Sequence, residues 1–557
     1  MANFLSKEHI TANANFNRWL VPPAALAVHL SIGMAYGFSV FWKPLGNALM
    51  GVDGKPLAAC AAGATNLSEK LSGTARALFA TDCNWTQFDL GWMFTLFFVL
   101  LGCSAALWGG WLEREGPRKA GLVSMVLWCG GLLISAYGVY AHQLWLMWLG
   151  SGVIGGIGLG LGYISPVSTL IKWFPDRRGM ATGMAIMGFG GGAMIGSPLA
   201  TKLMGHFATP NSPGVWQTFV VLAAIYFIFM LWGSLSYRVP PTGWKPANWT
   251  PPAAQNNVMI SNKHVHLNNA HKTPQFWLLW LVLCMNVSAG IGIIGAAAPM
   301  LQETFGGALI GQPDIGFADI KKDEALTAAA AAVGAGFVGL ISLFNIFGRF
   351  AWATSSDKLG RKRTYYIFFV LGTLMYCAAT YVAGFKSLAL FVGAFCVIAS
   401  MYGGGFSTIP AYLADMFGTQ FVGAIHGRLL TAWSTAGILG PVVVNYMHDT
   451  RLEAKVPFDQ VYAPIFLVLA GLLVVGFIAN FLVIPVAEKY YMTDAELEAV
   501  RKLAHEKADA SNPAGSMNST SQSVSHPILV VLAWALVLIP ISYGVWSTVQ
   551  KAWGLFH

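Results

Sequence analysis

Arg349 is the residue of this sequence whose position most needs a chemical explanation. It lies in the segment FVGLISLFNIFGRFAWATSS, among apolar and aromatic residues. An arginine at the centre of a membrane-spanning helix costs ~2.5–3.5 kcal/mol on insertion scales. Its guanidinium stays charged and presents a planar fork of donors that fits a carboxylate. We expect Arg349 to bind an organic anion. The alternative is that Arg349 lies close to the cytoplasmic end of the helix, since Asp357 follows nearby, and extends its charged group to the interface.

Asn345 lies one helical turn before Arg349, so on a helix the two side chains share a face. Its amide is a neutral donor to the same anion. His29, His426 and Asp415 are candidate proton acceptors, with structural roles as the alternative. No Cys/His cluster has the spacing of a metal site, and no G-x-x-x-x-G-K-[ST] nucleotide loop occurs, so we expect neither a metal nor a cofactor.

The composition places this arginine in a membrane protein. Of the 557 residues, 55% are hydrophobic and 10% are charged, against about 25% charged in an average soluble protein. The mean hydropathy is +0.58. The 21 Trp, 35 Phe and 62 Gly are typical of aromatic belts and close helix contacts in bilayers. These values exclude a soluble enzyme, a secreted disulfide scaffold and a disordered chain, and they make the lipid bilayer an expected partner.

Thirteen apolar stretches are long enough to cross the hydrocarbon core, for which about 20 residues suffice. The first six are predicted at 20–43, 88–112, 119–141, 144–171, 178–203 and 215–237. The remaining seven are predicted at 275–302, 327–354, 362–384, 387–415, 421–447, 460–487 and 527–549. With the N-terminus in the cytoplasm, the cytoplasmic segments hold about twice as many Lys and Arg residues as the outer loops. That bias explains the net charge of +9 without a nucleic-acid partner.

The two sets of six spans are an internal repeat. Sliding the chain on itself by 244 positions places Glu113 on Asp357 and Gly179 on Gly423. The same shift superposes further residues without a gap: Gly116 on Gly360, Arg118 on Lys362, Gly160 on Gly404, Pro166 on Pro410, Gly183 on Gly427 and Gly196 on Gly440. Six spans are an even number, so both copies have the same orientation. Two parallel bundles that rock around a central site are the architecture of a transporter.

We therefore predict an all-α polytopic membrane protein in six parts. These are a cytoplasmic N-terminus (1–19), a six-helix bundle (20–237), a cytoplasmic linker (238–274), a second six-helix bundle (275–487), a cytoplasmic tail (488–526) and an additional transmembrane helix (527–549). The tail begins with a charged, helical stretch and ends in a Ser/Asn-rich linker. The last span lies outside the repeat, so we expect it to serve packing or assembly. It or the tail is the expected docking site for a protein partner.

Two loops at repeat-related places carry acids, glycines and bases that can latch neighbouring helices. They read GGWLEREGPRKAG at 109–121 and ATSSDKLGRKR at 353–363. Both resemble the signature loop of the major facilitator superfamily, G-x-L-A-D-R-x-G-R-K; Glu113 replaces its Asp, Pro117 an Arg and Ala353 a Gly. The resemblance implies the two-bundle fold of that superfamily. It also implies a role in conformational gating for Glu113, Arg114, Gly116, Arg118, Asp357, Lys358, Gly360 and Arg361.

A second resemblance points to one branch of that superfamily. The run K-W-F-x-x-R-R-G-x-A-x-G within 160–192 and the segment MAYGFSVFWKPL at 34–45 are similar to the oxalate/formate antiporters and the related monocarboxylate transporters. The similarity covers roughly residues 18–487. It implies a carrier of small organic anions in a bacterial inner (plasma) membrane, coupled to a proton or to a counter-anion.

The same resemblance implies roles for single residues. An Arg on the eighth helix holds the substrate anion in this branch, which corresponds to Arg349. Proton-coupled monocarboxylate transporters resemble this segment but have Asp where this chain has Asn345, and Asn takes up no proton. The oxalate antiporter has a Lys on its eleventh helix where this chain has Trp433. One buried cation balances one carboxylate, so we favour a monocarboxylate such as lactate, pyruvate or formate. Oxalate/formate exchange is the alternative.

Aromatic residues are expected around the anion. By resemblance, Tyr402 and Phe406 on the tenth helix, Tyr36 on the first and Tyr163 on the fourth lie near cavity-lining positions. Ordinary packing is the alternative for each of them.

Two of the seven cysteines, Cys60 and Cys83, lie in the predicted outer loop, residues 44–87. If that face is oxidising, we expect them to form a disulfide. The other five fall inside predicted spans.

The expected function is secondary active transport of small carboxylates by alternating access, rather than catalysis. A membrane-embedded enzyme would need clustered His, Asp or Cys within the spans, and no such cluster is evident. A carboxylate sensor or scaffold built on a transporter fold is the alternative of another class. In an obligate exchanger, the charge of Arg349 without a bound anion must prevent the two halves from reorienting. In a symporter, that charge must be neutralised. Both mechanisms stay open at this point.

Overall fold

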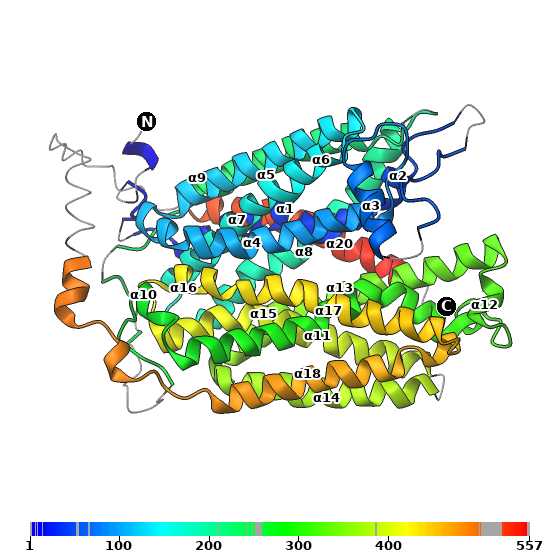
Figure 1. The fold of residues 1–557 in the computed structure, drawn as a ribbon. Helices are drawn as coiled ribbons and strands as arrows, with labels where there is room; N and C mark the ends of the chain where they lie inside the picture. Colours follow the sequence, from blue (N-terminus) through cyan, green and yellow to red (C-terminus); the bar gives the residue numbers. More distant parts are fainter. Residues whose placement is uncertain are drawn as a thin grey trace.

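The chain forms an all-α structure in a computed structural model (Figure 1). The structure describes residues 3–553 except 6, 8, 14, 52–54, 65–66, 211, 242, 248, 251–258, 385–386, 501 and 503–525. In these residues, 13 helices are long and apolar enough to cross a membrane, at the places that the sequence predicts. Most of the tail linker lies outside the described residues.

The N-terminal half contains the first six spans. The first runs from Arg18 to Gly46 and includes α1 (Val21–Ile32), the 3₁₀ segment η3 (Gly33–Phe41) and α2 (Trp42–Gly46). The others are α4 (Gln87–Glu115), α5 (Pro117–Tyr140), α6 with η4 and α7 (Leu144–Met147, Trp148–Gly155 and Gly156–Trp173), α8 (Arg178–Phe207) and α9 (Val215–Ser236).

The C-terminal half contains the next six spans. They are α11 (Pro274–Phe305), α13 (Glu324–Leu359), α14 (Arg361–Gly384), α15 (Leu388–Phe417), α16 with α17 (Val422–Leu429 and Thr431–Glu453) and α18 (Ala463–Leu482). Short helices α3 (Leu67–Ala77), α10 (Leu267–Ala270) and α12 (Phe317–Ile320) lie in the loops. The two halves form two layers in Figure 1, with the N-terminal half above.

The repeat is visible in the turns that follow α4 and α13. Each helix ends at a glycine with positive φ, 95° at Gly116 and 85° at Gly360, and the next helix begins at the following residue. A residue with a Cβ is strained in this conformation, so glycine makes the tight turn possible. Both turns lie at the end of the molecule that carries α10 and the interdomain linker, which we call the linker end (Figure 1). The opposite end carries α3 and α12, and we call it the disulfide end.

The two halves contact each other mainly where α8 meets α13 and where α4 meets α16 and α17; α8 also contacts α15, and α7 contacts α16. Small residues allow the close approach: a Cβ on Gly109 of α4 would lie 2.8 Å from the Cα of Ala424 in α16. Without a hydrophobic driving force inside a bilayer, such close packing is a main source of helix association. The interface between the halves therefore runs through the middle of the molecule.

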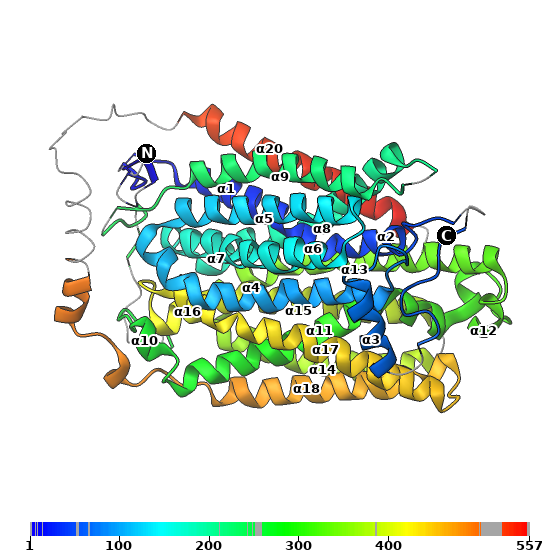
Figure 2. The same cartoon turned by 45° about the horizontal axis from the view of Figure 1, so that its top comes forward.

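The thirteenth span, α20 (Pro527–Trp553), packs on both halves. Its buried residues Val537, Gly544, Thr548 and Ala552 face α1 and α8 of the N-terminal half and α13 of the C-terminal half. Most of its other large apolar side chains are exposed, as expected for a lipid-facing helix. Figure 2 shows α20, in red, along the outside of the N-terminal half.

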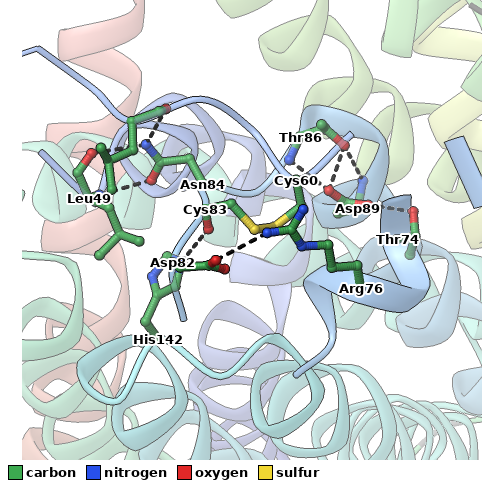
Figure 3. Close-up of a disulfide and its surroundings, with 11 residues drawn as sticks. Leu49, Cys60, Thr74, Arg76, Asp82, Cys83, Asn84, Thr86, Asp89 and His142 are labelled. Carbon is green, nitrogen blue, oxygen red and sulfur yellow. Dashed lines mark hydrogen bonds and ion pairs between the residues drawn. A yellow bond between two sulfur atoms is a disulfide. The ribbon is translucent and has the colours of Figure 1, made fainter. Parts of the chain in front are cut away.

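A disulfide between Cys60 and Cys83 ties the loop that precedes α4 (Figure 3). Asn84 fastens the same loop by donating to the carbonyl oxygens of Leu49 at 3.0 Å and Leu57 at 2.9 Å. His142, whose ring stacks on Trp85 at 4.3 Å, lies 2.9 Å through Nε2 from the Cys83 carbonyl oxygen. Burial lowers the pKa of His142, so its ring is neutral and Nε2–H donates this bond.

Replacing Cys60 and Cys83 by Ser should destabilise this loop by about 3 kcal/mol, because a cross-link removes loop-closure entropy from the unfolded chain. We expect faster trypsin cleavage at Lys70 and Arg76, both exposed in α3. Cys103→Ser, which changes an exposed free cysteine, is the control. Equal cleavage rates in the double variant and the control would contradict a stabilising disulfide.

Candidate functional site

Arg349 is fully buried in α13, where the two halves meet. Its Nε donates to Oδ1 of Asn345 at 2.8 Å, and its Nη1 donates across the interface to the carbonyl oxygen of Ile186 in α8 at 3.2 Å. Its Nη2 makes no hydrogen bond to the residues that the structure describes. Within the same residues no carboxylate forms an ion pair with it. Arg349 is therefore a buried cation with an unused donor and no counter-charge.

Glycines of α8 make room for this side chain. A Cβ on Gly190 would lie 2.9 Å from Nε of Arg349, and one on Gly183 would lie 2.9 Å from the Arg349 carbonyl oxygen. Ser407 of α15 fixes the other side of the backbone by donating to the same carbonyl oxygen at 2.6 Å. The glycine-rich stretch of α8 thus allows a large charged side chain to lie between two closely packed helices.

Three aromatic rings surround the guanidinium. The Cζ atom of Arg349 lies 5.5 Å from the ring centre of Phe406, 5.9 Å from that of Tyr36 and 6.0 Å from that of Phe189. At these distances the ring quadrupoles attract a cation. Tyr36 and Tyr402 also meet through their hydroxyl groups, 3.3 Å apart. The aromatic rings stabilise the charge weakly, without neutralising it.

Trp433 lies at the centre of the aromatic cluster. Its ring is fully buried and lies 4.5 to 6.3 Å, between ring centres, from five others: Phe406, Tyr163, Phe98, Phe189 and Tyr36. The indole N–H of Trp433 and the hydroxyl of Tyr163 are buried and make no hydrogen bond to the described residues. Buried polar groups are normally paired. These two orphaned groups are available as hydrogen-bond donors to a polar, uncharged part of a ligand.

The structure brings together all seven residues that the sequence suggests for substrate binding: Arg349, Asn345, Tyr402, Phe406, Tyr163, Tyr36 and Trp433. It adds Phe98, Phe189 and the carbonyl of Ile186, which sequence reasoning missed. The sequence could have indicated Phe189. It interrupts a run of glycines in α8, and a helix face made of glycines is expected to pack against another helix. Phe98 had no such signal, since it lies in the uniformly apolar FTLFFVLL.

A second group of residues joins the halves at the linker end. The Glu113 carboxylate of α4 accepts from the backbone N–H of Gly423, 2.9 Å away at the start of α16. The Asp357 carboxylate of α13 accepts from the N–H groups of Gly179 and Met180, at 2.8 and 2.9 Å, at the start of α8. These pairs are related by the internal repeat. In each, an acid of one half binds the positive end of a helix of the other half.

We call the interdomain contacts of Glu113 and Asp357 the latch. Basic residues bind the carboxylates at this end of the molecule. Arg361 binds Asp357 at 2.6 Å and Asp415 at 3.0 Å, and Arg178 of the other half binds Asp415 at 2.9 Å. Lys172 pairs with Glu113. Asp415 is therefore an ion-pair partner of two arginines in this structure.

The other predicted loop residues lie apart from the latch. Arg118 donates at 3.0 Å to the carbonyl oxygen of Phe4 and at 3.4 Å to that of Tyr237. Arg114 and Lys358 are exposed. Gly116 and Gly360 form the turns described above. In the part of the chain that the structure describes, no cluster of three or more His, Cys, Asp or Glu could hold a metal ion.

Comparison with known proteins identifies the family and the fold of the chain. A sequence model of the Major Facilitator Superfamily matches residues 57–441 and 287–555. The chain is 24% identical to the oxalate:formate antiporter of Oxalobacter formigenes over 352 residues, which covers 62% of this chain and 73% of that protein. It is 24% identical to apicoplast pyruvate carrier 1 of Toxoplasma gondii over 392 residues, covering 61% and 66%.

The fold is also that of a solved transporter. The proton:xylose symporter XylE aligns with a TM-score of 0.54 at 16% identity, covering 86% of this chain and 98% of the symporter. At that identity the likeness concerns the fold alone. With the family match, the two parallel halves and the 13 candidate spans, this multi-pass chain belongs to the major facilitator superfamily.

Proposed function

We propose that this transporter carries small monocarboxylates by alternating access, with Arg349 as the anion-binding group. The observation that carries the proposal is the buried guanidinium between the two halves, which has an unused Nη2 donor and no acidic partner among the described residues. Leaving such a charge uncompensated is costly unless an anion binds it for part of the cycle. A carboxylate fits the fork of a guanidinium and supplies the missing charge.

The substrate preference follows from charge and from the aromatic cluster. The single cation Arg349, which lies beside rings of the cluster, balances one carboxylate, and a second negative charge would lie against aromatic rings. The orphaned indole N–H and the Tyr163 hydroxyl suit a hydroxyl or keto oxygen instead. Lactate and pyruvate meet both requirements, and formate meets the charge requirement alone. The names of the two relatives, one for oxalate and formate and one for pyruvate, support the same chemical class.

Two observations support a cytoplasmic position for the linker end. The Cys60–Cys83 disulfide lies at the opposite end, and disulfides persist on oxidising faces. Lys and Arg residues are in excess in the predicted cytoplasmic segments. With this orientation the N-terminus is cytoplasmic, and the latch of Glu113 and Asp357 closes the cytoplasmic gate. Release of substrate to the cytoplasm then requires these interdomain bonds to break.

Arg349→Ala should abolish uptake of the transported monocarboxylate, with a loss of at least about 100-fold, because charge-assisted hydrogen bonds of 1.5–3 kcal/mol each disappear. The assay is uptake of labelled lactate, pyruvate, formate and oxalate into proteoliposomes, with and without internal carboxylate. Arg363→Ala, an exposed arginine of α14, is the matched control. Normal uptake by Arg349→Ala would reject the binding role. Binding without transport in the wild type would favour a sensor.

Trp433→Lys tests the proposed charge limit. A second buried cation should raise the ratio of oxalate to lactate uptake at least tenfold, even if total uptake falls through the lost aromatic packing. Trp433→Phe keeps the ring without adding charge and should leave the ratio within about threefold. Efficient oxalate uptake by the wild type would instead show that the unmodified site already accepts a dianion and would favour oxalate/formate exchange.

Asp357→Asn should open the linker end, because the neutral side chain binds the α8 N-terminus and Arg361 more weakly. We expect the ratio of open to closed molecules to rise about tenfold or more. Spin labels on cysteines at Arg114 and Lys358, exposed positions related by the repeat, report the distance between the halves in a Cys103→Ser background. Asp319→Asn, at an exposed ion pair near the other end, is the control. An unchanged distance distribution in Asp357→Asn would show that the latch does not hold the gate.

A further inference from the structure

His29 of α1 lies beside the proposed anion site and has an unusual pair of neighbours. The residue is fully buried. Its Nδ1 lies 2.5 Å from the carbonyl oxygen of Ala185 in α8, and its Nε2 lies 3.1 Å from the carbonyl oxygen of Tyr163 in α7. Both ring nitrogens therefore face hydrogen-bond acceptors that cannot donate.

Only a protonated ring satisfies both contacts. A neutral imidazole carries one N–H, so its other nitrogen would direct a lone pair at a carbonyl oxygen. An imidazolium donates from both nitrogens. His426 of α16 provides the contrast: it is also buried, yet neither of its ring nitrogens has a hydrogen-bond partner among the described residues. The backbone is arranged for a charged ring at His29 and offers nothing of the kind at His426.

His29 and Arg349 contact the same segment of α8. Arg349 donates to the carbonyl oxygen of Ile186, and His29 contacts that of Ala185, the preceding residue. The Phe189 ring lies 6.0 Å from the Arg349 Cζ and 6.2 Å from the His29 ring. A cation on His29 is therefore opposed by the Arg349 charge when the site is empty. A bound carboxylate cancels that charge and favours protonation of His29.

None of the other charged or titratable groups around His29, among the described residues, can take the place of the bound carboxylate. The Tyr163 ring of α7 lies 5.2 Å from the His29 ring. His426 of α16 lies 6.0 Å from the Tyr163 ring, and Tyr36 follows His29 on the same span. From α8, His29 meets Phe189 and backbone. The helices α9 and α20 contact other faces of α1, through Gly233 and Val537. Among these described neighbours there is no carboxylate, so the anion that can offset an imidazolium here is the substrate.

We propose that His29 is the proton-binding site of this carrier and that it couples one proton to one monocarboxylate. The proposal rests on the anion site described above. In the loaded carrier, a solvent proton is added to the ring of His29 while the carboxylate binds Arg349, and no other bond forms or breaks. The net charge at the centre is then one positive unit both when loaded and when empty. The charge of the empty Arg349 is therefore not neutralised, as the sequence led us to expect of a symporter; instead the loaded and empty states carry the same charge through the rocking motion. Proton and anion favour each other's binding equally.

The test compares His29→Gln with His426→Gln in proteoliposomes loaded with a pH-sensitive dye. In the wild type, an acidic exterior should drive accumulation of labelled lactate, and lactate entry should acidify the lumen. Exchange of lactate across a membrane without a pH gradient needs no net proton movement. We expect His29→Gln to retain this exchange within about threefold but to lose gradient-driven accumulation at least tenfold. His426→Gln should behave like the wild type in both assays.

A binding measurement decides the matter if His29→Gln does not fold. Titration of the purified wild-type protein with lactate at pH 7, in buffers of different ionisation enthalpy, gives the number of protons taken up on binding. About one proton per lactate supports the proposal, and none overturns it. Net lactate entry by the wild type without acidification of the lumen, or gradient-driven accumulation by His29→Gln, also overturns it while leaving the transport function intact. Absence of exchange and binding with lactate, pyruvate and formate alike would reject both proposals.

Discussion

The rest of the central site depends on one electrostatic constraint, a guanidinium held inside a bilayer without a counter-charge. A buried arginine normally pairs with a carboxylate or reaches the interface. Arg349 does neither among the described residues. It donates one hydrogen bond to Asn345 and one to the backbone of the opposite half. The glycines of α8, the surrounding rings and the unpaired donors all follow from keeping this charge at the interface of two bundles. The site lacks a counter-charge among the described residues, and in the proposed function an anion supplies it.

The internal repeat gives the molecule a pair of equivalent interdomain contacts. Glu113 and Asp357 hold opposite halves at the same end, each by capping a helix that begins in the other half. Their surroundings differ, because only Asp357 belongs to a chain of ion pairs through Arg361 to Asp415 and Arg178. Charge-assisted bonds to helix N-termini are strong enough to favour contact between the halves at the linker end, and they are few enough to be broken together. The repeat thus places an equivalent acid in each half, whereas the basic residues around the two acids differ.

Sequence reasoning located the spans, the repeat and the arginine with its asparagine, because length, hydropathy and helical spacing are local properties. It could not locate contacts that depend on how the helices pack. The spans are apolar on all sides, so no pattern distinguishes Phe98 and Phe189, which face the site, from phenylalanines that face lipid. The space that Gly190 leaves for Arg349 and the carbonyl groups around His29 appear only when α8 is placed beside α1 and α13. Among the loop residues, Arg114 and Lys358 match the motif but point to solvent.

The position of α20 has a mechanical consequence for a protein whose halves must move. This helix follows the C-terminal half in the chain, yet it packs on α1 and α8 of the other half as well as on α13. Its Thr548 meets Gly339 of α13, and its Gly544 meets Met194 and Ile195 of α8. A motion that separates α8 from α13 cannot preserve both contacts. At each place one of the two partners is a glycine, so neither contact interlocks two side chains. If the halves move as proposed, α20 must release one of the two contacts.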